Sequence, residues 1–340
     1  MSPAIRLFVA FLLLPVVAAE VRAQVFISSH FTIEQLAPGV FAAIATDNGY
    51  AGANAGIVDL GGKTIVFDTF LSPIAARDLL RAADQLTHTP VAFVVNSHFH
   101  NDHIRGNQVF SPDVEIISTE KTREAISLVE PQQRKWEIQN VPRLLENAQE
   151  SLADETDPFA RRDLLIQMSY YKAINESGTE LKTRLPNVTF EKNLTIHGTS
   201  RKVELLYIGG GHTPGDCIML LPDEHIAFVG DLVSNGVHPY MPDGSAEEWK
   251  TTLKELDALP IGTIVPGHGD LGHRLEITTM TNYIQDLQNI ARAMVLGGKT
   301  DDDISRDLIP SQYQTWLHTQ NFIDDVRFLY NQALTEKGRR

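Results

Sequence analysis

The chain has 340 residues, of which 43% are hydrophobic and 21% are charged, a balance typical of a globular protein with a sizeable core. Its formal net charge of -14 repels a phosphate backbone, and no stretch rich in lysine and arginine offsets that charge, so we expect no nucleic-acid partner. No linker rich in proline, glycine and serine separates two halves, which favours one α/β domain with an insertion.

The N-terminal segment has the pattern of an export signal. Arg6 precedes the apolar run LFVAFLLLPVVAA, and the following EVRAQ supplies small residues suited to cleavage after Ala23. A membrane-spanning helix needs about 20 apolar residues, and Pro15 interrupts this shorter run. We therefore predict a signal peptide at residues 1–23, a mature domain at 24–340, a periplasmic or secreted location and no stable membrane anchor after cleavage.

The first half of the mature chain alternates strands and helices. The segments GVFAAIA and NAGIVDLGGKTIVFD read as strands, the second being a hairpin turned at Gly61 and Gly62. A helix is expected from near Ser72, and the strand VAFVVN follows it and leads directly into SHFHNDH. This order places polar side chains at the carboxyl ends of strands, where α/β proteins build their sites.

The second half repeats this plan. The segment CIMLLPDEHIAFVGD reads as strand, turn and strand ending at Asp231, as the first hairpin ends at Asp68. A helix through SAEEWKTTLKELDAL, the strand GTIV and the loop PGHGD come next. Two halves with one plan predict an α/β fold, a four-layer αββα sandwich of two pseudo-symmetric halves.

Two further regions have helical periodicity. One is an insertion at about residues 119–184, broken at Asp157 and Pro158, and the other is a pair of C-terminal helices at about residues 274–336. The insertion has two interpretations: a packed helical hairpin of no special role, or a wall or lid over the site that the preceding strand supplies.

Four candidate ligands lie within six residues, at His98, His100, Asp102 and His103. Imidazole and carboxylate are the ligands of zinc and similar ions. In an extended segment His98 and His100 point the same way, whereas Asp102 and His103 face another direction as the chain turns away. One hexapeptide can therefore serve two metals, but it cannot complete either coordination sphere.

Three later segments supply the missing ligands. His212 lies in the glycine-rich turn GGGHTPGD, Asp231 ends a strand in VGDLV, and His268 lies in the turn VPGHGD. Each follows a predicted strand, so all three are expected at strand ends.

The ordered set HFHNDH, GHTPGD, GDLV and PGHG closely resembles the metallo-β-lactamase-fold hydrolase superfamily, from roughly Gly39 to His268. The resemblance implies two zinc ions, with iron or manganese as possible replacements. It also implies a first metal held by His98, His100 and His212, a second held by Asp102, His103 and His268, and Asp231 as a bridge. A water between two such cations becomes the nucleophile, and Asp102 is the catalytic candidate for orienting it.

Other polar residues have supporting or uncertain roles. Asp68 is expected to hydrogen-bond a ligand histidine. His238 and Tyr240, in the loop SNGVHPYMPDG, either contact a substrate or pack. The only cysteine, Cys217, excludes a lipid anchor and an internal disulfide, and is expected to be a buried, inert thiol. The remaining histidines are expected to be surface or capping groups: His30, His88, His197, His225, His273 and His318.

The ligand set favours one chemistry among those that this scaffold hosts. Asp231 resembles the bridging aspartate of glyoxalase II and the acyl-homoserine lactonases, whereas the best-known zinc β-lactamases have cysteine or serine there. His100 and the lack of a flavin domain argue against the diiron oxidoreductases. We therefore expect an exported dinuclear metal-dependent hydrolase that cleaves a carboxylic ester, thioester or lactone of a small-molecule substrate. The alternatives are a β-lactam-hydrolysing enzyme and a catalytically silent, metal-holding binding protein.

Overall fold

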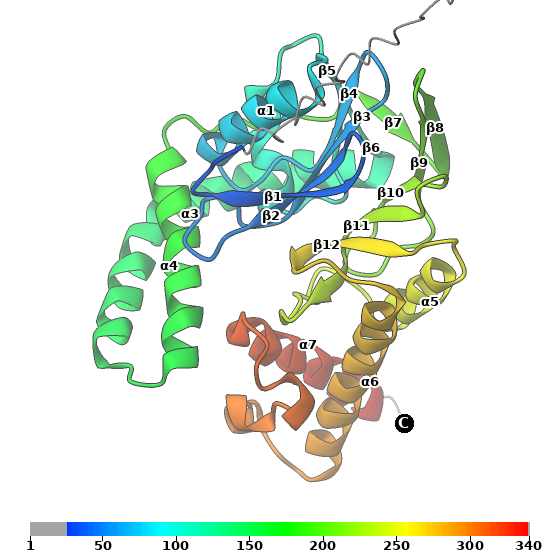
Figure 1. Ribbon diagram of the computed structural model, residues 1–340. Helices are drawn as coiled ribbons and strands as arrows, with labels where there is room; N and C mark the ends of the chain where they lie inside the picture. Colours follow the sequence, from blue (N-terminus) through cyan, green and yellow to red (C-terminus); the bar gives the residue numbers. More distant parts are fainter. Residues whose placement is uncertain (1–25, 339–340) are drawn as a thin grey trace, which may run out of the picture.

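The computed structural model describes residues 26–338, and the predicted signal peptide lies outside this range (Figure 1). Within the described range, each helix is too short or too polar to cross a lipid bilayer.

Two β-sheets form the centre of the fold. The first has seven strands, in the order β1 to β7, with antiparallel pairing up to β4 and parallel pairing from β4 to β7. The second has the order β12-β11-β10-β9-β8, in which only the β11–β12 pair is parallel. The strands are β1 (Phe31–Ala37), β2 (Val40–Ala45), β3 (Ala55–Asp59), β4 (Thr64–Phe67), β5 (Val91–Val95), β6 (Glu115–Thr119), β7 (Val188–Phe190), β8 (Asn193–His197), β9 (Lys202–Leu206), β10 (Ile218–Leu221), β11 (Ile226–Asn235) and β12 (Thr263–Gly269).

The predicted repeat of one plan is visible in the two sheets. In the first, the β3–β4 hairpin is followed by helix α1 (Pro73–Thr87) and by β5, which pairs parallel to β4. In the second, the β10–β11 hairpin is followed by α5 (Ala246–Asp257) and by β12, which pairs parallel to β11. The first hairpin turns at Gly61 and Gly62, both with positive φ, a conformation that glycine adopts without strain.

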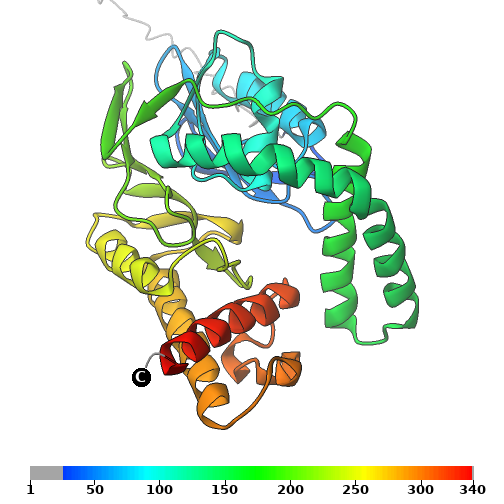
Figure 2. The ribbon, with the colours of Figure 1, turned by 180° about the vertical axis from the view of Figure 1, so that it is seen from behind.

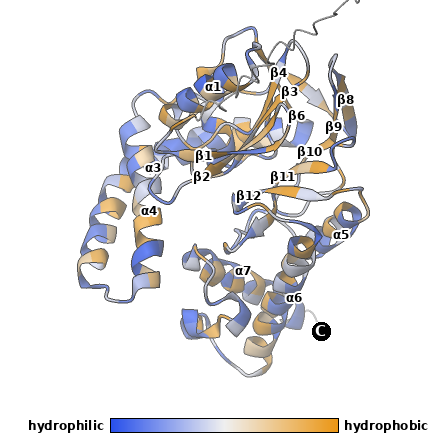
Figure 3. Cartoon of the chain, in the orientation of Figure 1, coloured by the Kyte–Doolittle hydropathy of each residue, from blue (hydrophilic) through white to orange (hydrophobic). Residues whose placement is uncertain are grey.

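Helices cover the outer face of each sheet. Apolar side chains from both sheets pack between them, and the rings of Phe67 and Phe228 have centroids 5.8 Å apart. The outer face of the first sheet is covered by α1 through Leu79 and its neighbours, and that of the second by α5 and by α6 (Arg274–Leu296). Figure 3 shows hydrophobic residues along the strands of both sheets. The four-layer αββα sandwich is confirmed.

Two helical additions flank the sandwich. The insertion after β6 consists of α3 (Glu120–Asp154) and α4 (Pro158–Ser177), which pack against each other as a projecting hairpin (Figures 1 and 2). The break between them is at Asp157, whose side chain caps α4 by accepting a hydrogen bond from the Ala160 N–H. After α6, short turns lead to α7 (Thr319–Gly338), which packs against α6.

Candidate metal centre

The candidate ligands come together at one edge of the sandwich. His98 and His100 directly follow β5, and the short helix α2 (Asn101–Ile104) carries the next two. His212 lies in the loop between β9 and β10, while Asp231 and His268 belong to β11 and β12. The sequence placed Asp231 at the end of a strand, but β11 continues past it to Asn235.

The ligand atoms form two groups, and within each they lie within 4.8 Å of one another. Asp231 belongs to the first group but also faces the second. Its Oδ1 lies 3.2 Å from His103 Nε2, and its Oδ2 lies 3.3 Å from His212 Nε2 and 3.2 Å from His268 Nε2. The first group is His98, His100, His212 and Asp231, and the second is Asp102, His103 and His268.

Four atoms of this cluster are buried without forming a hydrogen bond of ordinary geometry to another described residue: His98 Nε2, His103 Nε2, His212 Nδ1 and Asp231 Oδ1. An unpaired buried polar atom costs about 1–3 kcal/mol, so a further binding partner is expected at this point. Imidazole nitrogens and carboxylate oxygens in this number match a divalent cation. The residues present therefore fit the metal that the sequence pattern implies.

Burial and neighbouring charges shift the pKa values of the clustered side chains. Burial opposes ionisation of Asp231, but the neighbouring histidines, His268 and His103 foremost, outweigh it and hold the pKa of this carboxyl well below its ordinary value. Burial lowers the pKa of His212 to about 3, although Asp231 opposes the shift. His212 thus stays neutral, the form in which imidazole binds a metal.

Hydrogen bonds from neighbouring residues orient the ligand rings. Asp68 Oδ2 lies 2.8 Å from His103 Nδ1, as expected from the sequence. Ser97 Oγ lies 2.9 Å from His98 Nδ1, and Asp243 Oδ2 lies 3.0 Å from His100 Nε2. Such partners fix which nitrogen carries the proton and leave the other one for a metal. The roles of Ser97 and Asp243 were not predicted, because neither residue belongs to a recognised motif.

The two candidate substrate residues differ in position. His238 is 0% exposed and packs among aromatic side chains, with its Nδ1 2.9 Å from the Tyr283 hydroxyl. Its side chain therefore packs, which was one of the two interpretations. Tyr240 is 36% exposed, and its ring centroid lies 5.9 Å from that of His100. It stands beside the first ligand group.

The helical insertion supports the ligand segment directly. The buried Arg105 guanidinium binds the carboxylates of Glu130 and Glu137 on α3. Asn101 Nδ2 donates to Glu137 Oε1 at 2.9 Å and to the Tyr170 hydroxyl of α4 at 2.7 Å. Since α2 carries Asn101 next to two of the ligands, the insertion packs against the segment that holds them, and its role as a wall or lid over the site stays a prediction.

His318 does not lie where the sequence suggested. Among the histidines expected at surfaces or caps, His88 does end α1 and His273 does precede α6. His318, however, is half-buried, with its ring centroid 5.9 Å from that of His268. Burial, and next the neighbouring His268, lower its pKa to about 4. No local motif marks it, because its neighbours come from distant segments.

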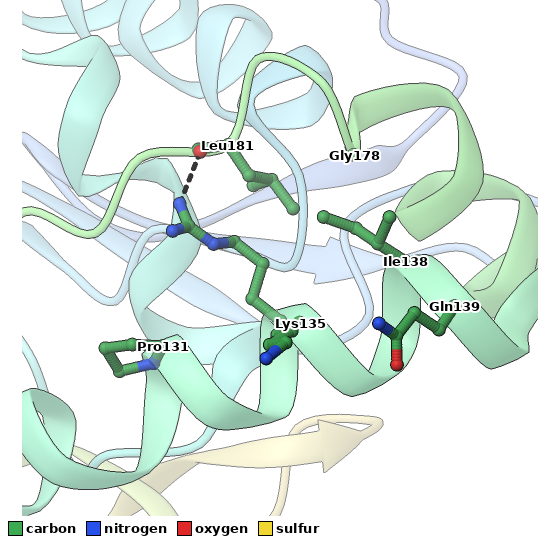
Figure 4. A pocket seen from close by; sticks show the side chains of 7 residues that line it. Pro131, Lys135, Ile138, Gln139, Gly178 and Leu181 are labelled. Carbon is green, nitrogen blue, oxygen red and sulfur yellow. Dashed lines mark hydrogen bonds between the residues drawn. The ribbon is translucent and has the colours of Figure 1, made fainter.

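A hollow of about 460 Å³ lies elsewhere, between α3 and the segment that follows α4 (Figure 4). Its lining includes Pro131, Lys135, Ile138 and Leu181, and none of the seven clustered ligands. It is separate from the metal centre. Cys217 is fully buried, and burial raises the pKa of its thiol well above the ordinary value, as expected of an inert cysteine.

Comparison with known proteins agrees with this geometry. Residues 49–268 match the metallo-beta-lactamase superfamily. A metallo-beta-lactamase type 2 of Bacteroides fragilis is 30% identical over 93 residues, which are 26% of this chain and 37% of that protein. The alpha subunit of a 2,4-dinitroanisole O-demethylase from Nocardioides sp. is 25% identical over 207 residues, which are 60% of this chain and 48% of that protein. The chain thus spans less than half the length of the curated relatives it matches.

A solved structure extends the likeness beyond the matched region. A stereoselective inverting sec-alkylsulfatase from Pseudomonas sp. superposes with a TM-score of 0.64 and 18% identity, covering 89% of this chain and 50% of that one. At this identity the likeness shows a shared fold.

Proposed function

Because the chain belongs to the metallo-beta-lactamase superfamily, we propose that it is a dinuclear metal-dependent hydrolase of carboxylic esters, thioesters or lactones. The observation that carries the proposal is the pair of ligand groups with Asp231 facing both. Zinc is the default metal, and iron or manganese suits the same nitrogen and oxygen donors.

Each ligand group has a defined task in this proposal. His98, His100 and His212 would hold one ion, Asp102, His103 and His268 the other, and Asp231 would contact both. When bound, two divalent ions lower the pKa of a shared water toward neutrality and polarise the bond that is cleaved. Asp102, whose Oδ2 lies 3.5 Å from His268 Nε2, would orient that water.

The charges around the site favour an uncharged substrate. Residues 96–104, 203–249 and 263–273, which carry all seven ligands, contain no lysine or arginine. The nearby Arg105 is buried and already paired with two glutamates, while the carboxylate of Asp243 binds His100. A sulfate ester, a phosphodiester or the carboxylate of a β-lactam would find no side-chain cation in these segments. Esters, thioesters and lactones need none.

A hydrolysis screen of the zinc-loaded protein tests the proposal. Nitrophenyl acetate, an acyl thioester and γ-butyrolactone are compared with a cephalosporin, a nitrophenyl sulfate and a nitrophenyl phosphodiester, and His212→Ala serves as the control for contaminating activity. We expect the first three to be cleaved faster, with loss of activity in the variant. Faster cleavage of the cephalosporin would favour the lactamase alternative. No turnover of any compound, with metal bound, would favour the binding-protein alternative.

We further propose that the protein is exported, supported by the charge, apolar run and small-residue site of residues 1–23. N-terminal sequencing of secreted or periplasmic material should give a start near Gln24. A start at Met1 would contradict cleavage.

A further inference from the structure

His318 brings an imidazole to the metal centre from outside the family-matched region, which ends at residue 268. Its ring and that of His268 meet edge to face, with an angle of 66° between their planes, and His268 belongs to the second ligand group. No hydrogen bond joins either ring nitrogen of His318 to another described residue, although its backbone is firmly held. The polar atoms of this ring are therefore unpaired among the described residues, beside a ligand of the metal centre.

The backbone of His318 is fixed in an unusual conformation. Its φ of 62° lies in the left-handed region, which side chains other than glycine adopt at a cost of about 1–2 kcal/mol. Asp163 of α4 accepts hydrogen bonds from the backbone N–H of His318 at 2.6 Å and of Thr319 at 2.9 Å. Leu317 pairs with the segment after β11, donating to Gly236 O at 3.0 Å. Strain of this kind persists only where several contacts impose it.

Contacts among three segments that are distant in the sequence thus fix the backbone that carries the His318 ring. These segments are α4 of the insertion, the segment after β11 and the start of α7. We propose that His318 is a substrate-contacting residue, whose imidazole N–H donates a hydrogen bond to the acyl oxygen of a substrate at the metal centre, and that Asp163 is its positioning residue. This proposal rests on the proposed hydrolase function, since that function supplies the acyl oxygen.

The variant His318→Asn tests the contact, because asparagine tolerates the left-handed conformation and removes the imidazole. His88→Asn is the matched control: His88 has a φ of 55°, is exposed and ends α1. With zinc-loaded protein and nitrophenyl acetate, kcat/KM should fall on the order of 100-fold in His318→Asn, the loss expected for one donor to a developing charge. Bound zinc and thermal stability should match those of the control.

Hexanoate, a carboxylate with the acyl oxygens of an ester product, gives a second readout by calorimetry. Its affinity for the zinc-loaded protein should fall about tenfold in His318→Asn and stay unchanged in His88→Asn. If the wild type binds hexanoate in this way but cleaves no ester, the proposed function fails and the contact stands. Hexanoate binding that is absent in the wild type, or that survives the substitution together with kcat/KM, overturns the contact.

The role of Asp163 is tested by its coupling to His318. Asp163→Ala removes both acceptors at the start of α7 and should lower kcat/KM and hexanoate affinity by less than His318→Asn does. In the double variant the Asp163 substitution should cause no further loss, because the residue acts through His318. Additive losses would mean that Asp163 acts independently. Loss of one zinc ion from His318→Asn would mean that the ring supports His268 instead, and would also overturn the proposal.

Discussion

The hydrogen bonds of Asp68 predict a specific loss of metal affinity in Asp68→Asn. The carboxylate accepts three bonds: from the Ser97 N–H at 2.8 Å to Oδ1, and from Ser97 Oγ at 2.7 Å and His103 Nδ1 at 2.8 Å to Oδ2. An amide has one acceptor oxygen, so keeping the backbone bond turns its NH2 group toward His103. The proton of His103 then moves to Nε2, the atom that faces the metal position.

We expect the second ion to bind about 10- to 100-fold more weakly in this variant, which is about 1.4–2.8 kcal/mol of binding free energy. The first ion should lose less affinity, because Asp68 acts on that group only through Ser97 Oγ, which lies 2.9 Å from His98 Nδ1. Zinc titration against a competing chelator at fixed pH measures both affinities. Two ions held as tightly as in the wild type would refute the reasoning.

Asp325→Asn is the matched control. Asp325 of α7 is equally buried, and its Oδ1 accepts a hydrogen bond from the Met241 N–H at 2.7 Å. Burial raises the pKa of this carboxyl well above its ordinary value, which favours the protonated form, and that form is close in shape and charge to asparagine. Zinc affinity should therefore be unchanged, and a loss like that of Asp68→Asn would show that any buried polar change has this effect.

Three further outcomes are expected. Asp231→Asn should weaken the second ion and reduce turnover of all substrates alike; a change in substrate preference with both ions tightly held would contradict a bridging role. Glu137→Ala leaves the buried Arg105 partly unpaired and should destabilise the fold by about 3–5 kcal/mol in thermal unfolding, whereas Glu146→Ala on the exposed face of α3 should be neutral. Burial lowers the pKa of His238 from 6.5 to about 4, so the unfolded chain binds more protons between these values and stability falls as pH falls. Acidification from about pH 7 to about pH 5 should lower the free energy of unfolding of the metal-free wild type by roughly 2 kcal/mol more than that of His238→Gln. Denaturant unfolding at several pH values measures this, and an equal pH dependence of the unfolding free energy in the two proteins would contradict it.

The ligand cluster could be predicted from the sequence because its residues lie in short, recognisable motifs. The ligands lie in the segment that follows β5, in the loop before β10, and within β11 and β12, so they lie in or next to strands that meet at one edge of the fold. The hydrogen bond between Asp68 and His103 could also be predicted from the sequence, because Asp68 directly follows β4, which pairs with β5.

The rest of the site depends on contacts between distant segments. His238 lies in a polar loop sequence, yet Tyr283 and Phe322 from α6 and α7 bury it. His318 has no motif of its own, and its position depends on Asp163, which is 155 residues earlier in the chain. Periodicity predicts that helices form there, but it does not predict which helix ends meet beside the metal centre.

The central claim is that the two ligand groups hold two ions, and metal analysis of the purified protein tests it most directly. After saturation with zinc and removal of the excess, elemental analysis should give close to two ions per chain, because seven ligand side chains exceed what one tetrahedral ion binds. His103→Ala should reduce the value to one, since only the second group is broken. A wild-type chain that holds a single ion under saturating zinc would contradict the account.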